Sequence, residues 1–161
     1  MLASTACKKR NEVKSGTLNL DLEVEVGVDS SRWILAAGGI HTSDNAAIAE
    51  LIDEIDRYDI QSMKYSIWEL YGNDSCMFSG KLVFSNPNNS SSTVIYSYEN
   101  FDFEPIEEKI AMDFPENQLQ TLEDMLRSSH GVDVKLEGEV SHKPIHFVLN
   151  VEMNVNAIAE K

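Results

Sequence analysis

The strongest constraint on the fold is a strict two-residue alternation near the start of the chain. Between residues 17 and 28, every second position is apolar: Leu18, Leu20, Leu22, Val24, Val26 and Val28. Successive side chains of a β-strand point to opposite faces, so this rhythm predicts a strand with one buried and one solvated face. The solvated face carries Asp21, Glu23 and Glu25, and we expect it to point away from the core.

The same alternation recurs in later segments, at residues 62–67, 76–84, 93–98, 133–140 and 146–155. We expect the first two of these to form one hairpin and the last two another, because short connections favour antiparallel pairing. The Asn- and Ser-rich residues 86–92 predict an exposed loop. Residues 33–35 fit either a short strand or a helical turn. The last strand mirrors the first in length and pattern, so the two are expected to be neighbours in one sheet.

Two segments have helical spacing instead. Apolar residues recur at i, i+3, i+4 and i+7 from Ile48 to Ile55, and a second stripe runs from Leu119 to Leu126 between Pro115 and Gly131. We therefore predict a mainly β, α+β domain, an antiparallel β-sandwich or sheet packed by helices 45–58 and 115–129. The domain is expected to span residues 17–157, with residues 158–161 as a C-terminal tail.

The charge balance limits the partners. Thirteen Lys and Arg oppose 27 Asp and Glu, which gives a formal net charge of -14. Such a surface repels phosphate backbones, so no nucleic-acid binding is expected. Solubility is the ordinary role of the acid excess, and attraction of cations or of a basic partner is the alternative.

The first residues favour an exported protein. Small residues lead to Cys7 and a basic stretch follows, as at the end of a bacterial lipoprotein signal whose cleavage frees the cysteine for a lipid. We therefore treat residues 2–7 as a lipobox remnant, residues 1–16 as a disordered tail or tether, and Cys7 as the lipidation site. A plain tail with an incidental cysteine is the alternative. Cys76 is expected to be a small buried residue that does not pair with Cys7.

The strand segments 63–67, 78–82, 134–138 and 147–151, together with Cys7, resemble a type of bacterial envelope lipoprotein. Such proteins have a lipidated N-terminal cysteine, a helix, and strand pairs that end in a long alternating strand. The resemblance implies an exported β-rich domain and brings no catalytic residues with it.

No catalytic, cofactor or metal motif is recognisable, so none is assigned. A Gly-x-Ser-x-Gly elbow is missing from the sequence. His142 and His146 are four residues apart, but Pro144 opposes a helix between them and no third ligand is suitably spaced, so surface histidines are expected. His41 and His130 are isolated. The carboxylates at Asp21, Glu23 and Glu25 and at residues 53–56 are expected to be a solvated surface and not a calcium site.

Three aromatic residues are candidates for ligand contact. Trp68 and Tyr71 lie beside a predicted loop, and Trp33 follows the first strand. Together they could form a platform for a sugar or a peptide, although packing at the end of the sheet is the commoner role for such residues and the one we expect.

The sequence thus predicts a non-enzymatic module of the bacterial cell envelope, in the periplasm or on the outer surface, that binds or supports something. Its partners would be the membrane, through a lipid on Cys7, and a protein or glycan ligand. A small hydrolase with a site assembled from distant residues is one alternative. A cytoplasmic interaction domain, with Cys7 incidental, is another.

Overall fold

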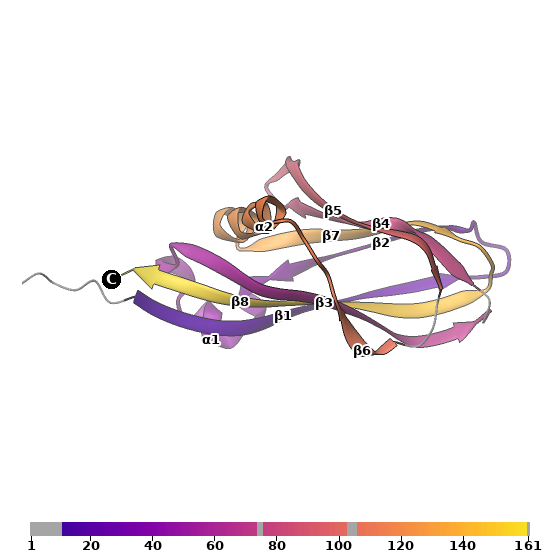
Figure 1. The fold of residues 1–161 in the computed structure, drawn as a ribbon, viewed down its shortest axis with the longest axis horizontal. Coiled ribbons are helices and arrows are strands. Elements are labelled where there is room, and N and C mark those ends of the chain that lie inside the picture. The colour runs from indigo at the N-terminus through magenta and orange to yellow at the C-terminus, as the bar shows by residue number, and fades with distance from the viewer. Residues whose placement is uncertain (1–10, 74–75, 103–105, 161) are drawn as a thin grey trace, which may run out of the picture.

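The computed structural model describes residues 11–73, 76–102 and 106–160. Over these residues the chain forms eight antiparallel strands and two α-helices (Figure 1). The strands are β1 (Asn11–Val26), β2 (Trp33–His41), β3 (Arg57–Gly72), β4 (Met77–Asn86), β5 (Asn89–Asp102), β6 (Ile106–Ala111), β7 (Gly131–Val140) and β8 (Ile145–Glu160). The helices are α1 (Ala46–Ala49) and α2 (Glu116–Ser129).

The described strands build two four-stranded sheets that face each other. Sheet A has the order β1-β8-β3-β6, and sheet B has the order β2-β7-β4-β5. Consecutive strands therefore alternate between the sheets along most of the chain, which is the strand order of an eight-stranded jelly roll. The predicted mainly β sandwich with two helices is confirmed.

The core lies between the sheets and is filled by the inward side chains of both. Phe147 and Met153 come from β8, Leu136 from β7 and Phe84 from β4, and each is almost fully buried. One stripe of α2, namely Leu122, Met125 and Leu126, is buried as well and belongs to the same cluster. Helix α2 lies at the end of the sandwich where β8 ends (Figure 1). It has the predicted bounds to within one residue.

Strand β1 pairs with β8 along its whole length, from Asn11 opposite Glu160 to Val26 opposite Ile145. The predicted neighbourhood of the first and last strands is confirmed. The predicted tails are too long, because residues 11–16 and 158–160 belong to these strands. Side-chain hydrogen bonds extend the pairing on the outer face: Ser15 and Thr17 donate to Asn156 and Asn154, and Asn150 donates to Asp21.

The predicted helix 45–58 is mostly wrong. Asn45 does cap a helix, since its Oδ1 accepts from the backbone N–H groups of Ala47 and Ile48, but α1 ends at Ala49 and only a short 3-10 turn follows at Ile52–Glu54. The chain then becomes β3, because β8 offers a second edge for pairing. Asp56 begins this pairing, with its backbone N–H on Ile158 O and its carboxylate accepting from Glu160 N.

Both predicted hairpins are also wrong. β3 lies in sheet A and β4 in sheet B, and β7 and β8 are divided in the same way. Each of the four strands hydrogen-bonds to a strand distant in sequence, β3 to β8 and β4 to β7. Their alternating patterns are real, but alternation reports which face is buried and not which strand is the partner.

The tight hairpin occurs instead between β4 and β5. Asn86 pairs with Asn89, so most of the predicted loop 86–92 is strand. The Asn86 side chain accepts from Asn88 N across the turn. Residues 33–35, for which a strand and a helical turn were both open, begin β2.

A polar cluster on the outer face of sheet A joins β6 to β8. Lys109 donates to Glu152, which also accepts from Asn154, and Asn154 donates in turn to Ser62. The Lys109 ammonium holds the pKa of the Glu152 carboxyl below its usual range, against the opposing effect of burial. The ion pair thus fixes the short β6 to the central strand.

Replacing Cys76 should cost stability. Its side chain is fully buried, and its thiol donates to His142 O across 3.2 Å. Cys76→Ala leaves a small void and an unpaired carbonyl, so the free energy of unfolding should fall by about 1 to 2 kcal/mol. Urea melts of the wild type and the variant measure this, and an unchanged midpoint would show that the thiol is not packed.

The Glu152 ion pair should make stability depend on acid. Because its pKa is lower in the folded than in the unfolded protein, its contribution is present above the unfolded value of about 4.3 and is lost as the pH falls through the folded value. Urea midpoints of wild type and Glu152→Gln should therefore differ most above the unfolded value of about 4.3 and converge as the pH falls below it. Glu139→Gln, at an exposed position on sheet B, is the matched control. A constant difference would contradict the role of the ion pair.

Candidate functional site

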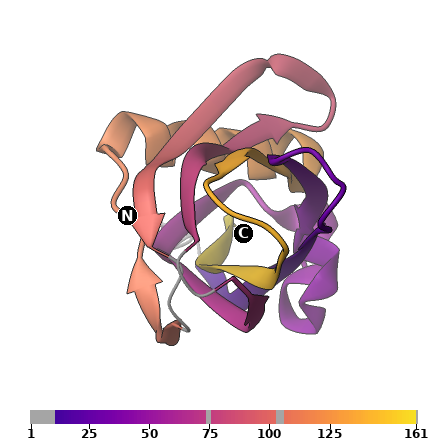
Figure 2. The same ribbon diagram turned by 90° about the vertical axis from the view of Figure 1, so that its right-hand side faces the viewer.

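The connections β1–β2, β3–β4 and β7–β8 meet at one end of the sandwich, called here the loop end, which faces the viewer in Figure 2. Backbone hydrogen bonds tie these connections together: Val140 N donates to Arg32 O, Ser141 N to Met77 O, and Asn73 N to Pro144 O, over 2.8 to 3.0 Å. Lys143 also donates to Ser30 O. These hydrogen bonds hold the connections in fixed positions relative to one another, and so they position the side chains at this end.

Two rows of residues cross the outer face of sheet A at the loop end. The first row is Glu25, His146 and Tyr71, from β1, β8 and β3, and the second is Glu23, Val148 and Trp68 from the same strands. Alternation on β8 points His146 and Val148 outward, because Phe147 and Leu149 lie in the core. We call the aromatic part of these rows, Trp68, Tyr71 and His146, the platform.

His146 is the centre of the platform. Tyr71 stacks on its ring, with ring centroids 4.3 Å apart and planes 13° from parallel. Its Nε2 lies 4.0 Å from a carboxylate oxygen of Glu23 and 4.0 Å from one of Glu69. Although it points outward it is only 6% exposed, and its Nδ1 has no hydrogen-bond partner among the described residues. Two carboxylates thus converge on an imidazole that the stacked tyrosine covers.

A β-bulge brings the second carboxylate to the platform. The pairing of β3 with β8 shifts between Trp68 and Tyr71, and Glu69 has a positive φ of 51°. Such a bulge redirects side chains, and here it directs Glu69 towards His146. Gly72 follows with φ of 119°, and a Cβ there would lie 2.5 Å from Pro144 O, so only glycine fits.

The aromatic candidates from the sequence are exposed. Trp33, Trp68 and Tyr71 keep 58%, 45% and 63% of their surface in contact with solvent, so the expectation that they pack at the end of the sheet is wrong. Trp68 and Tyr71 share the platform. Trp33 begins β2 and lies beyond the β1 edge, in sheet B.

Sequence reasoning missed His146 and Glu69 as parts of this arrangement. His146 was expected at the surface, whereas it is buried beneath Tyr71. Its position on the outward face follows from the alternation of β8, but the approach of Glu23 follows only from the β1–β8 register. The bulge at Glu69 has a weak signal, the break of alternation before Gly72.

A groove runs beside the platform, between the adjacent edges of the two sheets. It encloses about 310 Å³ between β1 and β2. Glu23 and Glu25 lie on its β1 side, and Trp33 and Leu35 lie on its β2 side. Ser30 and Ser31 close it at the turn. Glu23 and Glu25 therefore border both the platform and this edge groove.

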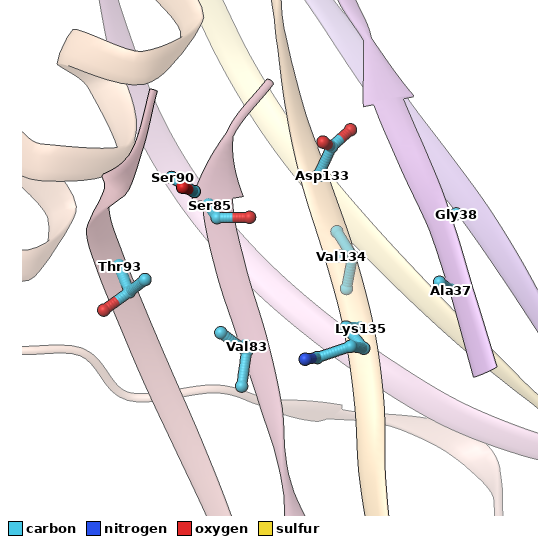
Figure 3. A pocket seen from close by; sticks show the side chains of 9 residues that line it. All are labelled: Ala37, Gly38, Val83, Ser85, Ser90, Thr93, Asp133, Val134 and Lys135. Atoms are coloured by element: carbon cyan, nitrogen blue, oxygen red, sulfur yellow. The ribbon is translucent and has the colours of Figure 1, made fainter. Parts of the chain in front are cut away.

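A larger hollow than the edge groove lies on the outer face of sheet B and measures about 570 Å³ (Figure 3). Small side chains such as Ala37, Ser85 and Thr93 create it, as large neighbours do not cover the sheet there. Its ammonium, that of Lys135, is paired with Glu137 over 3.0 Å. Because its lining residues include no aromatic ring and no convergent group of charges, we prefer the loop end as the candidate site.

The remaining predicted groups are dispersed. Within the described ranges, no three His, Cys, Asp or Glu side chains are placed to hold a metal ion. His142 lies in the turn, with its Nδ1 2.8 Å from Ser141 Oγ, and makes no common site with His146. Asp21, Glu23 and Glu25 are exposed, as predicted. Cys7 lies outside the described residues. Neither α-helix of the described part has the length and hydropathy to cross a membrane.

No protein-family model matches the chain, and none of the curated proteins matches it. Among solved structures, a chain from Desmodium yellow mottle tymovirus is similar with a TM-score of 0.42 and 9% identity, over 95% of this chain and 83% of that one. A chain from a semi-empty virus-like particle of the nodavirus of the giant freshwater prawn Macrobrachium rosenbergii is similar with a TM-score of 0.37 and 12% identity, over 100% of this chain and 89% of that one.

Proposed function

We propose that this protein is a non-enzymatic binding module of the bacterial cell envelope, and that its platform captures a cationic side chain of a protein partner. The observation that carries the proposal is the convergence of Glu23 and Glu69 on His146 beneath the stacked ring of Tyr71. Exposed aromatic faces rimmed by carboxylates are the surroundings that a guanidinium or ammonium group prefers.

The net charge supports the same partner. The whole chain carries -14, so a basic partner is attracted from a distance before it makes contact. Locally, Glu23, Glu25, Asp29 and Glu69 outnumber Arg32 and Lys143, and Lys143 is held by Ser30 O. A polar glycan would gain less from this field, so we favour a protein ligand over a glycan.

The expected affinity for one isolated cation is modest. A cation over an exposed aromatic face contributes about 0.5 to 1 kcal/mol, and each exposed ion pair contributes up to about 1 kcal/mol. One such contact and two ion pairs give at most about 3 kcal/mol, which is less than the value of about 4 kcal/mol that corresponds to a millimolar dissociation constant. Useful affinity therefore requires a partner that presents more than one group.

The course of the chain agrees with an anchor at Cys7. Strand β1 begins beside the end of β8 and runs to the loop end, so the two termini of the described chain lie together, opposite the platform (Figure 1). A strand of 16 residues spans roughly 50 Å. A lipid on Cys7 would thus leave the platform at the end of the domain that is distant from the membrane.

A hydrolase is the second candidate, and one contact favours it. Ser141 Oγ lies 2.8 Å from His142 Nδ1, as a nucleophile lies beside its base. However, the same oxygen accepts a hydrogen bond from Met77 N, and the two residues are consecutive in an exposed turn. We therefore rank this function below binding.

Titration with acetyl-arginine amide tests the platform. The chain has two tryptophans, so Trp33→Phe leaves Trp68 as the single indole reporter. Its fluorescence should change saturably, with a dissociation constant on the order of 10 mM. Acetyl-citrulline amide, which has nearly the same shape without the charge, should cause no saturable change.

The carboxylates provide the matched variants. Glu23→Gln combined with Glu69→Gln should weaken arginine binding at least about threefold, because two ion pairs are lost. Glu139→Gln, which removes an exposed carboxylate from sheet B, should leave it unchanged. Equal binding of the charged and uncharged probes would refute the cation site.

Mass spectrometry tests the anchor independently of the platform. Expressed in bacteria with its native upstream sequence, the protein should carry diacylglycerol on Cys7, and Cys7→Ser should abolish the added mass. An unmodified soluble product would instead support the cytoplasmic alternative.

A further inference from the structure

The edge groove lies next to the platform and could hold the segment that presents the cation. It lies between two strands that are consecutive in sequence but belong to different sheets. In the described part of the chain, β1 is hydrogen-bonded to β8 and β2 to β7, and each strand ends its sheet. Edge strands keep outward backbone N–H and C=O groups available for an added extended segment.

The two sides of the groove differ in chemistry. Glu23 and Glu25 make the β1 side acidic, whereas Trp33 and Leu35, which is 65% exposed, make the β2 side apolar. An extended segment alternates its side chains between two directions. A segment that alternates basic and apolar residues would therefore satisfy both sides at once.

We propose that the edge groove binds an extended segment of a partner protein in which basic and apolar residues alternate, with one basic side chain reaching the platform. This inference rests on the proposed function and names its partner class. The lining from Glu23 to Val26 is about 13 Å long, which fits about four extended residues. A second copy of this chain is disfavoured as the occupant, because two chains of charge -14 repel each other.

The probe is a six-residue peptide of alternating Lys and Val with blocked ends. Its control has the same composition but three Lys followed by three Val. Trp68→Phe leaves Trp33, on the groove, as the single reporter. The alternating peptide should saturate the Trp33 signal and bind at least about fivefold more tightly than the block peptide, since only alternation serves both sides of the groove.

Leu35→Lys supplies the discriminating variant. Position 35 is exposed, so the substitution should leave the unfolding midpoint nearly unchanged. It should weaken the alternating peptide at least about tenfold, through lost apolar contact and added repulsion. In the Trp33→Phe background it should leave arginine amide binding, read at Trp68, unchanged.

The outcomes separate the two proposals. Equal binding of the two peptides, or no effect of Leu35→Lys on the alternating peptide, would overturn the proposal that the groove binds an extended segment. Arginine binding at Trp68 would still support the platform as a cation site in that case. Failure of arginine to bind at Trp68 removes both. A dimer in sedimentation that Leu35→Lys dissociates would identify a second copy as the occupant and overturn the peptide proposal.

Discussion

The full-length pairing of β1 with β8 is the interaction on which the rest of the structure depends. It joins the first and last strands over 16 residues and places β8 in the interior of sheet A, where β3 pairs with its other edge. Because β8 is shielded on both sides, even its outward residues His146, Val148 and Glu152 are buried. Both the polar cluster around Glu152 and the platform around His146 therefore depend on this central strand. The cluster joins β6 to the sheet, and the platform brings two carboxylates close to His146.

Much of the fold could be predicted from the two-residue alternation of apolar and polar residues, because this alternation indicates which face of each strand is buried. It identified the faces of β1 and β8 and led to their pairing. It did not identify partners elsewhere, since a one-face pattern is the same for a hairpin and for strands in opposite sheets. The helix expected at 45–58 failed for a related reason: Ile48 and Leu51 are buried as a stripe would require, but strand pairing at Asp56 ends the helical course.

The candidate site was predictable only in part. Trp33, Trp68 and Tyr71 were found from their place beside loops, yet their exposure depends on which side of each strand the core occupies. The role of His146 required the register that sets Glu25 and Tyr71 on either side of it, and that of Glu69 required a bulge. The net negative charge, in contrast, could be read directly from the sequence. It favours a basic partner, as the exposed aromatic faces do.

The late position of β8 also has a consequence for biogenesis. Strand β1 is synthesised early with one apolar face, and its partner β8 is the last strand of the described chain. Non-local pairing of this kind delays closure, so sheet A stays open until β8 has been synthesised. The apolar face of β1 therefore depends on β8 for its cover, and sheet A closes late in folding.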